Sequence, residues 1–384
     1  MSNASPRRLA SSRPVHRTAA ARLPAVAGLC ALVALTAVVA RPAAAQPVPA
    51  PVAADQAFRL GDLPPVAANP ITPAKAALGH ALFFDPRLSG NGTVSCASCH
   101  NPSLGWSDGL KTGIGINGTV LSRATPTIVN VAYNTQFMWD GRSRSLEDQA
   151  LGPMKAAEEM KTDFTSMMRM LSSIDGYRDL FEKAFPGEPI GEATVAKALA
   201  AFQRTVVSKD SRFDRWLDGD RTALTPQEWR GFQVFKDPAK GNCAVCHSGP
   251  NFTDNGYHNI GVAQAHGKED PGRFAVRALP SMKGAFKTPT LRDVALTAPY
   301  FRDGSAASLM EVVEHYNRGG DDKSNLSRDV RPLNLGRQEM EDLVAFMHTL
   351  TGRQPIVALP QLPQSPRAPT ASVARPSNPV SARN

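Results

Sequence analysis

Apolar residues recur at helical spacing in four stretches of the 384-residue chain. Two of these stretches begin with a threonine and a proline, which favour a helix start. Thr72 precedes KAALGHALFFD, and Thr225 begins a capping box that precedes WRGFQVFKD. Longer amphipathic helices are expected over 192–217 and 336–350. With 32 prolines and 29 glycines in the chain, the pattern predicts short helices, long connections and few strands.

Each threonine-proline helix leads into the same short motif. The two copies read Cys96-Ala97-Ser98-Cys99-His100 and Cys243-Ala244-Val245-Cys246-His247. This is the attachment pattern of c-type haem, in which two thiols add across the vinyl groups and the adjacent histidine reaches the iron from its proximal side. We therefore expect two covalently bound haem c groups in two related cytochrome c modules.

Other uses of these cysteines have to be weighed against haem attachment. Four cysteines in an exported protein can form two disulfides, and Cys-x-x-Cys pairs can also bind zinc or act as redox dithiols. A zinc site would need its ligand pairs brought together. The two motifs instead lie far apart, each with a domain's worth of sequence around it, so haem is the favoured interpretation.

The N-terminus has the layout of a secretory signal. Arginines come first, an apolar run follows at about 26–40, and Ala43-Ala44-Ala45 precedes Gln46. The run is shorter than the roughly 20 residues of a membrane-spanning helix. We expect cleavage before Gln46 and release into the periplasm with no membrane attachment; an uncleaved anchor is the alternative.

The net charge of +9 belongs mostly to this leader, where six arginines and no acidic residue precede Gln46. The rest of the chain shows no basic stripe interleaved with aromatic residues. Nucleic acid is therefore not expected as a partner.

Length and pattern together divide the chain into five segments. They are a signal peptide at 1–45, a Pro/Ala-rich linker at 46–70, an N-terminal haem domain at 71–217, a C-terminal haem domain at 218–352 and a disordered Pro-rich tail at 353–384. The predicted fold class is mainly α, with two cytochrome c-like haem domains in tandem and long loops.

Several longer segments are more distinctive than the haem motifs alone. They include LFFDPRLSGNGTVSCASCHNP, WDGRSRSLEDQALGP, PGRFAV and KTPTLRDVALTAPYFRDGS. Over nearly all of residues 71–352 the chain resembles the dihaem cytochrome c peroxidase and MauG family. The resemblance implies a peroxidase-type oxidoreductase in which the N-terminal haem binds peroxide and the C-terminal haem passes electrons to it.

The resemblance also assigns residues to the distal side of the first haem. Many members carry a histidine that blocks the iron until the partner haem is reduced; Ile116 stands there in this chain, so we expect an open first haem. Glu159 matches the acid–base glutamate, Gln149 the distal glutamine and Trp139 the aromatic residue between the haems. On residue type alone, Glu159 would be a solvated carboxylate and Trp139 part of the core.

The second haem differs from many family members in its expected axial ligand. The matching segment reads PYFRDGSAASLMEVVEHYNRGG, with Tyr316 where those members have methionine and Arg302 where they have histidine. Tyrosine is the MauG pattern, and a phenolate ligand would give this haem a low potential. His315 and Met310 are the alternative ligands.

The family also binds calcium between its domains. Thr297 and Pro299 would offer backbone carbonyls to the ion, whereas Ala124 replaces the usual asparagine ligand. Calcium is therefore an expectation with one ligand missing.

Three functions fit these observations. The first is reduction of hydrogen peroxide with electrons from a small periplasmic donor, either a cytochrome c or a copper protein. The second is a MauG-like oxidase that modifies a protein substrate through an oxidised state shared by both haems. The third is an electron carrier without catalysis, against which Ile116 argues. The resemblance leaves a homodimer open.

Overall fold

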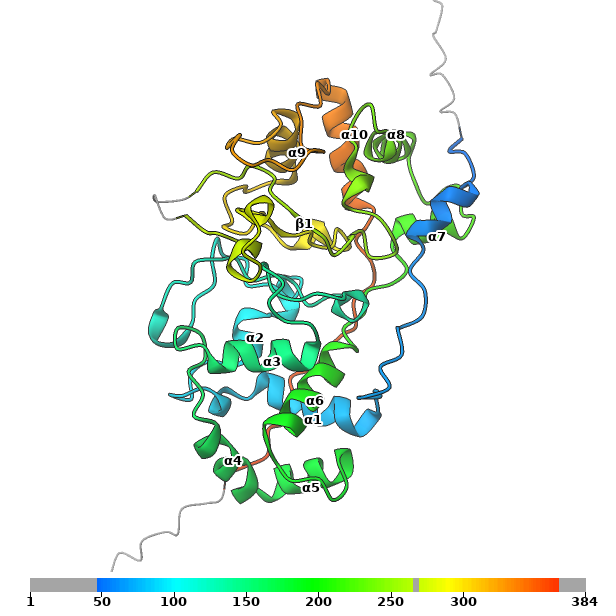
Figure 1. The fold of residues 1–384 in the computed structure, drawn as a ribbon. Helices are drawn as coiled ribbons and strands as arrows, with labels where there is room; N and C mark the ends of the chain where they lie inside the picture. Colours follow the sequence, from blue (N-terminus) through cyan, green and yellow to red (C-terminus); the bar gives the residue numbers. More distant parts are fainter. Residues whose placement is uncertain (1–46, 265–268, 366–384) are drawn as a thin grey trace, which may run out of the picture. The chain divides into compact units, whose positions relative to one another are not determined.

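The computed structural model describes residues 47–264 and 269–365 (Figure 1). The expected signal peptide and the last part of the expected tail lie outside these ranges. The α-helices are α1 (Pro73–Phe84), α2 (Cys96–Cys99), α3 (Leu146–Lys155), α4 (Phe164–Ser173), α5 (Asp175–Ala184), α6 (Glu192–Gln203), α7 (Arg212–Leu217), α8 (Pro226–Lys236), α9 (Leu309–Asn317) and α10 (Arg337–His348).

Short turns and one small sheet complete the described secondary structure. Strands β1 (Tyr257–His258) and β2 (Phe286–Lys287) pair antiparallel, with Tyr257 opposite Lys287. The 3-10 turns are η1 (Ala53–Phe58), η2 (Pro86–Leu88), η3 (Pro102–Leu104), η4 (Ile116–Gly118), η5 (Val131–Tyr133), η6 (Cys243–Val245), η8 (Arg273–Ala275), η9 (Pro280–Met282) and η10 (Val294–Leu296). Across the described ranges, no helix is both long and apolar enough to cross a bilayer.

Both predicted threonine-proline helix starts are confirmed. The Thr72 hydroxyl accepts a hydrogen bond from the Lys75 amide at 3.2 Å. At the second start, Thr225 accepts from the Glu228 amide and donates its own amide to the Glu228 carboxylate at 2.8 Å. The predicted helix over 336–350 is also present, as α10.

The single long helix predicted over 192–217 is wrong. The chain forms α6 and α7 with an irregular segment between them, in which Val206 and Ser208 bond to Asn130 instead of continuing the helix. The Val206 carbonyl accepts from the Asn130 amide at 2.9 Å, and the Ser208 amide donates to the Asn130 side-chain oxygen at 2.9 Å. A new capping box formed by Ser211 and Asp214 then starts α7. The Ser-x-x-Asp spacing was the signal for this second start.

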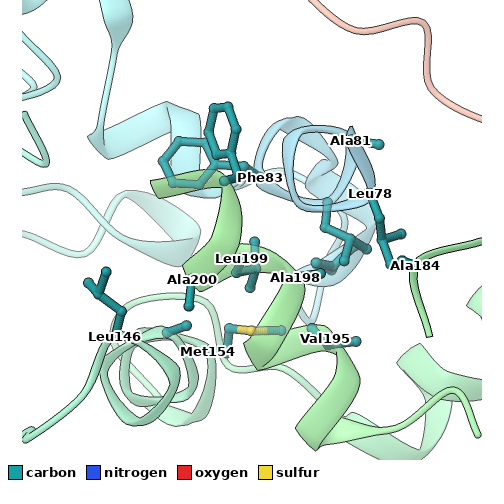
Figure 2. Close-up of a cluster of buried hydrophobic side chains, with 14 of the residues drawn as sticks. Leu78, Ala81, Phe83, Leu146, Met154, Ala184, Val195, Ala198, Leu199 and Ala200 are labelled. Carbon is teal, nitrogen blue, oxygen red and sulfur yellow. The ribbon is translucent and has the colours of Figure 1, made fainter. Parts of the chain in front are cut away.

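Two hydrophobic clusters hold these helices together. The first cluster gathers apolar side chains from α1, α3, α4, α5 and α6, and the second gathers them from α7 to α10. Figure 2 shows part of the first cluster, where Leu78 and Phe83 of α1 lie near Val195 and Leu199 of α6.

The same glycine contact recurs in both clusters. A Cβ atom on Gly79 of α1 would lie 1.9 Å from the carbonyl oxygen of Ala198 in α6, and a Cβ atom on Gly231 of α8 would lie 1.9 Å from that of Asp342 in α10. Only glycine allows these backbones to approach so closely. The predicted fold class, mainly α with two cytochrome c-like domains in tandem and long loops, is confirmed; its exact domain boundaries stay a prediction.

The segment predicted as a linker is not free of the fold. Val48 and Phe58 are buried in the second cluster, and Asp55 forms an ion pair with Lys236 at 2.6 Å. Proline and alanine dominate the composition of 46–70, so its few large apolar residues were not recognised as anchors.

The first part of the predicted disordered tail is also ordered. Residues 209 and 353 pair through two backbone hydrogen bonds, and the chain then returns toward α1 and α6 (red in Figure 1). Val357 and Leu362 pack against the first cluster, and the Pro363 carbonyl accepts a hydrogen bond from Arg87 at 3.0 Å.

Candidate dihaem site

The four motif cysteines are free thiols in two separate places. Cys96 and Cys99 form α2, and Cys243 and Cys246 lie in and beside η6. Burial raises the pKa of the Cys99 thiol to about 11 and that of Cys246 to about 12. Redox dithiols work through a lowered thiol pKa. The structure therefore gives no support to the disulfide or dithiol alternatives.

The zinc alternative finds no support either. Within residues 47–264 and 269–365, one group of three side chains has its ligand atoms close enough for a metal ion, namely Cys246, Asp254 and His258. Its cysteine belongs to the second haem motif, and the first motif contributes nothing to it. The two Cys-x-x-Cys pairs are thus not brought together into a tetrahedral site.

Both motif histidines bind a backbone carbonyl through Nδ1 and leave Nε2 free for another contact. The Nδ1 atom of His100 lies 3.2 Å from the Trp106 carbonyl oxygen, and that of His247 lies 3.0 Å from the Phe252 carbonyl oxygen. A carbonyl oxygen can only accept, so each Nδ1 carries the proton and each Nε2 keeps its lone pair. Burial also lowers the pKa of both rings, to about 4 for His247, which keeps them neutral. This is the arrangement that metal-binding histidines adopt.

Each motif faces its own cavity. The N-terminal cavity is bordered by Cys96, Cys99 and His100, and the C-terminal cavity by Cys243, Cys246 and His247. Several residues border both cavities, so the two lie next to each other; they are His100, Ala124, Thr125, Pro126, Met138, Trp139, Gln149 and Gln203. Paired thiols, a neutral histidine and a largely apolar wall fit one haem c in each cavity.

Glu159 borders the N-terminal cavity and is half-buried. Burial raises the pKa of its carboxyl group, while the charge of Arg142 lowers it and that of Glu158 raises it further. Gln149, on α3, borders the same cavity. The expected acid–base and amide groups are thus brought together beside His100.

The loop that holds Ile116 is fixed to the backbone of Glu159. The Ile116 amide donates to the Glu159 carbonyl oxygen at 2.8 Å, and a Cβ atom on Gly115 would lie 1.9 Å from the Glu158 carbonyl oxygen. Gly115 borders the cavity, whereas the Ile116 side chain is buried elsewhere. The loop therefore presents no iron-binding side chain to the cavity.

Trp139 lies at the boundary between the cavities and is held from both sides. Its indole Nε1 donates to the Ala124 carbonyl oxygen at 2.8 Å, and its own carbonyl accepts from the Lys287 amide at 2.8 Å. Because it borders both cavities, its position agrees with the expected place between two haems.

Tyr316, on α9, borders the C-terminal cavity, whereas His315 and Met310 do not. Burial raises the pKa of the Tyr316 hydroxyl. Both ring nitrogens of His315 are already occupied, Nδ1 by Asp321 at 2.9 Å and Nε2 by the Ile260 carbonyl at 2.8 Å. His315 therefore has no nitrogen left for iron.

The residues expected to bind calcium also border the C-terminal cavity. Thr297, Pro299 and Ala124 all line it. The Ala124 carbonyl is engaged by Trp139, and its methyl side chain offers no oxygen. Calcium binding stays a prediction.

Three cationic residues near the cavities were missed as site residues. Lys287 and Arg302 border the C-terminal cavity, and Arg123 borders the N-terminal one, where it pairs with Asp140 at 2.7 Å and Asp270 at 2.8 Å. Lysine and arginine are rarely buried, so residue type alone argues against such a place. The positions of Lys287 in KTPTLRD and of Arg302 in PYFRDG were the only signal for those two residues.

Comparisons with known proteins identify the family of the chain. Residues 73–222 match the family described as di-haem cytochrome c peroxidase, and residues 229–351 match cytochrome c. The methylamine utilization protein MauG of Methylorubrum extorquens is 47% identical over 296 residues, which cover 77% of this chain and 83% of that protein. The cytochrome c551 peroxidase of Nitrosomonas europaea is 38% identical over 309 residues, covering 77% of this chain and 89% of that protein.

Solved structures are similar as well. A MauG-like protein associated with microbial copper homeostasis superposes with a TM-score of 0.71 and 34% identity, over 76% of this chain and 95% of that one. The diheme peroxidase BthA from Burkholderia thailandensis gives a TM-score of 0.65 and 26% identity, over 80% and 92% of the two chains. The chain therefore belongs to the dihaem cytochrome c peroxidase and MauG family and is a peroxidase-type oxidoreductase.

Proposed function

We propose that the protein reduces hydrogen peroxide at the N-terminal haem with electrons that the C-terminal haem passes to it. The observation that carries this proposal is an asymmetry between the cavities. Glu159 borders only the N-terminal cavity, whereas Tyr316 borders only the C-terminal cavity. One cavity thus offers an acid–base group and the other an additional iron ligand.

In this proposal Cys96 and Cys99 hold the first haem, and Cys243 and Cys246 hold the second. His100 and His247 are the proximal ligands, and Tyr316 is the second ligand of the C-terminal haem. The bound haems supply an iron that peroxide can reach in the N-terminal cavity and a store of electrons in the C-terminal one. A phenolate ligand at Tyr316 stabilises the oxidised form of the second haem.

The proton transfers fall to Glu159. Its carboxylate accepts a proton from the near oxygen of peroxide and returns it to the far oxygen, which leaves as water. Two electrons from the donor and two protons from solvent then release the near oxygen as a second water. Burial suits this group to the exchange, because it raises the pKa of the carboxyl and so makes the carboxylate a stronger proton acceptor. The Gln149 amide is available to orient the peroxide by hydrogen bonding.

Electrons reach the N-terminal site past Trp139. Its indole ring is oxidisable, it borders both cavities, and its two backbone-anchored hydrogen bonds limit its movement. The donor in this proposal is a small periplasmic cytochrome c or copper protein. It requires that the leader direct export and be cleaved before Gln46.

A MauG-like oxidase is the second candidate. Tyr316 in the C-terminal cavity and the 47% identity to the MauG protein of Methylorubrum extorquens favour it. In that case an oxidised state shared by the two haems, with Trp139 between them, would act on a protein substrate in place of a small donor.

Ferric spectra and peroxide turnover separate these functions. Optical and electron paramagnetic resonance spectra of the haem-loaded protein should show one high-spin haem and one low-spin haem without a methionine band. Fast peroxide reduction by a reduced cytochrome c or copper protein supports the peroxidase. Slow turnover with a long-lived spectral change after one equivalent of peroxide supports the oxidase. Two low-spin haems inert to peroxide would contradict both.

A further inference from the structure

Two buried cations in the C-terminal cavity have no carboxylate partner. Lys287 is 8% exposed and Arg302 is 7% exposed. The Lys287 ammonium donates to the Thr288 carbonyl at 2.7 Å, and the Arg302 guanidinium donates to the Val262 carbonyl at 3.3 Å. Among the described residues, neither side chain forms an ion pair.

The other buried cations each have a carboxylate partner, which Lys287 and Arg302 lack. Four lysine or arginine side chains in the described ranges are buried: Arg204, Lys287, Arg292 and Arg302. Arg204 binds both oxygens of Glu147, and Arg292 binds both oxygens of Asp214 at 3.0 Å. The two cations without such a partner are the two that border the C-terminal cavity.

Neighbouring acids do not fill this role. The negative charge of Asp254 favours the charged form of Lys287. The Asp254 carboxylate already accepts hydrogen bonds from His258 and from the Gly256 amide. Asp303 and Asp270 both favour the charged form of Arg302, but neither forms an ion pair with it. Asp303 accepts from the Ser305 amide at 3.1 Å, and Asp270 is bound by Arg123 through two hydrogen bonds of 2.8 Å. Burial therefore prevails and lowers the pKa of both cations, to about 8 for Lys287.

An unpaired charge in a protein interior is costly, so a buried cation is normally matched by an anion. We propose that Lys287 and Arg302 form an anion-binding pair for the propionate carboxylates of the C-terminal haem. This inference rests on the proposed attachment of that haem at Cys243 and Cys246. Once the thioether bonds fix the macrocycle in this cavity, its two carboxylates are the anions that it brings with it.

The pair would also act on the electron-transfer step. Positive charge beside a haem favours its reduced form and raises its potential, whereas a phenolate ligand lowers it. Lys287 and Arg302 thus partly offset Tyr316 and keep the second haem reducible by its donor. The Lys287 amide also binds the Trp139 carbonyl, which places this cation beside the residue shared by both cavities.

The test is the midpoint potential of the C-terminal haem, measured on the haem-loaded protein near neutral pH, where Lys287, with a pKa of about 8, is charged. Lys287→Met and Arg302→Met should each lower this potential, and the double variant should lower it further. A propionate left without its cation should also make the potential depend on pH in the neutral range. Lys287→Arg should keep the wild-type value. Lys283→Met is the matched control, because Lys283 is an exposed lysine on the same segment and should cause no shift.

Haem content separates the two ways in which the test can fail. Loss of the second haem from wild-type protein, seen by mass and Soret absorbance, would contradict the proposed function itself. Two haems with unchanged potentials in Lys287→Met and Arg302→Met would overturn the anion-binding pair alone. If these variants do not fold, resonance Raman spectra of wild type and Lys287→Arg test the contact through the bending modes of the propionates. A shift of these modes in Lys287→Arg supports the contact. Unchanged modes contradict it.

Discussion

The N-terminal and C-terminal haem sites share a scaffold and differ in their charged groups. Both have a threonine-proline helix that crosses a partner helix at a glycine, and both have a motif histidine whose Nδ1 faces a carbonyl. The N-terminal cavity adds a half-buried acid, Glu159. The C-terminal cavity adds Tyr316 and two unpaired cations. In the proposed function, the shared scaffold fixes where the two haems attach, and the groups that differ give each haem its role.

Removing the N-terminal acid should have the largest effect. Glu159→Gln keeps the shape of the side chain but cannot exchange a proton, so peroxide turnover should fall by about 10²–10⁴-fold. Glu158→Gln is the matched control, because Glu158 is the exposed neighbour in the same segment. Steady-state kcat/KM for peroxide measures both. Equal losses in the two variants would show that charge in this segment, and not a proton-exchanging Glu159, supports turnover.

Displacing that acid without removing it should have a somewhat smaller effect. Gly115→Ala places a Cβ atom 1.9 Å from the Glu158 carbonyl oxygen, so the loop and Glu159 must move apart. A misplacement of about 1 Å can cost on the order of 10²-fold in rate. Gly152→Ala is the control, since nothing lies within 4 Å of its added methyl group. Turnover and the spin state of the ferric N-terminal haem should change in Gly115→Ala alone; wild-type values there would contradict the proposed positioning.

Exchanging the C-terminal ligand should make that site resemble those of methionine-ligated relatives. Tyr316→Met should raise the midpoint potential of the second haem by on the order of 0.1 V or more, because thioether ligation favours the reduced form. Spectroelectrochemistry measures the change. Met310→Leu should leave the potential unaltered, since Met310 borders neither cavity. A shift on Met310→Leu and none on Tyr316→Met would reassign the ligand.

The smallest effect concerns pH and the N-terminal site. Burial raises the pKa of the Glu159 carboxyl above its ordinary value of 4.5. A base must be deprotonated, so kcat/KM should fall about tenfold per unit as the pH drops below this raised pKa. Arg142 opposes the shift and Glu158 reinforces it. Arg142→Met should therefore move the acid limb to higher pH and Glu158→Gln to lower pH. If kcat/KM of Glu159→Gln still falls at low pH as in wild type, the titrating group is not Glu159.

Local signals in the sequence predicted a large part of this structure. The capping residues Thr72 and Thr225 fixed two helix starts, and the motif spacing placed thiols and histidine together. The break between α6 and α7 could not be predicted from periodicity, because its backbone bonds to the distant Asn130. Local pattern carries no information about such long-range pairs.

The site residues divide in a similar way. Glu159 and Tyr316 came from family resemblance, since a lone glutamate or tyrosine has no spacing that reveals its chemistry. Lys287 and Arg302 were not predicted as site residues, because their meaning lies in burial without a partner, and a sequence does not show that.

Each end of the described chain packs on the module that is farther away in the sequence. Val48 and Phe58, near the start, complete the core of the second module, and Val357 and Leu362, near the end, complete that of the first. A cut between residues 217 and 218 would therefore leave each fragment with uncovered apolar surface. Each module therefore completes its core only with a segment that the chain supplies from the far side of the other module.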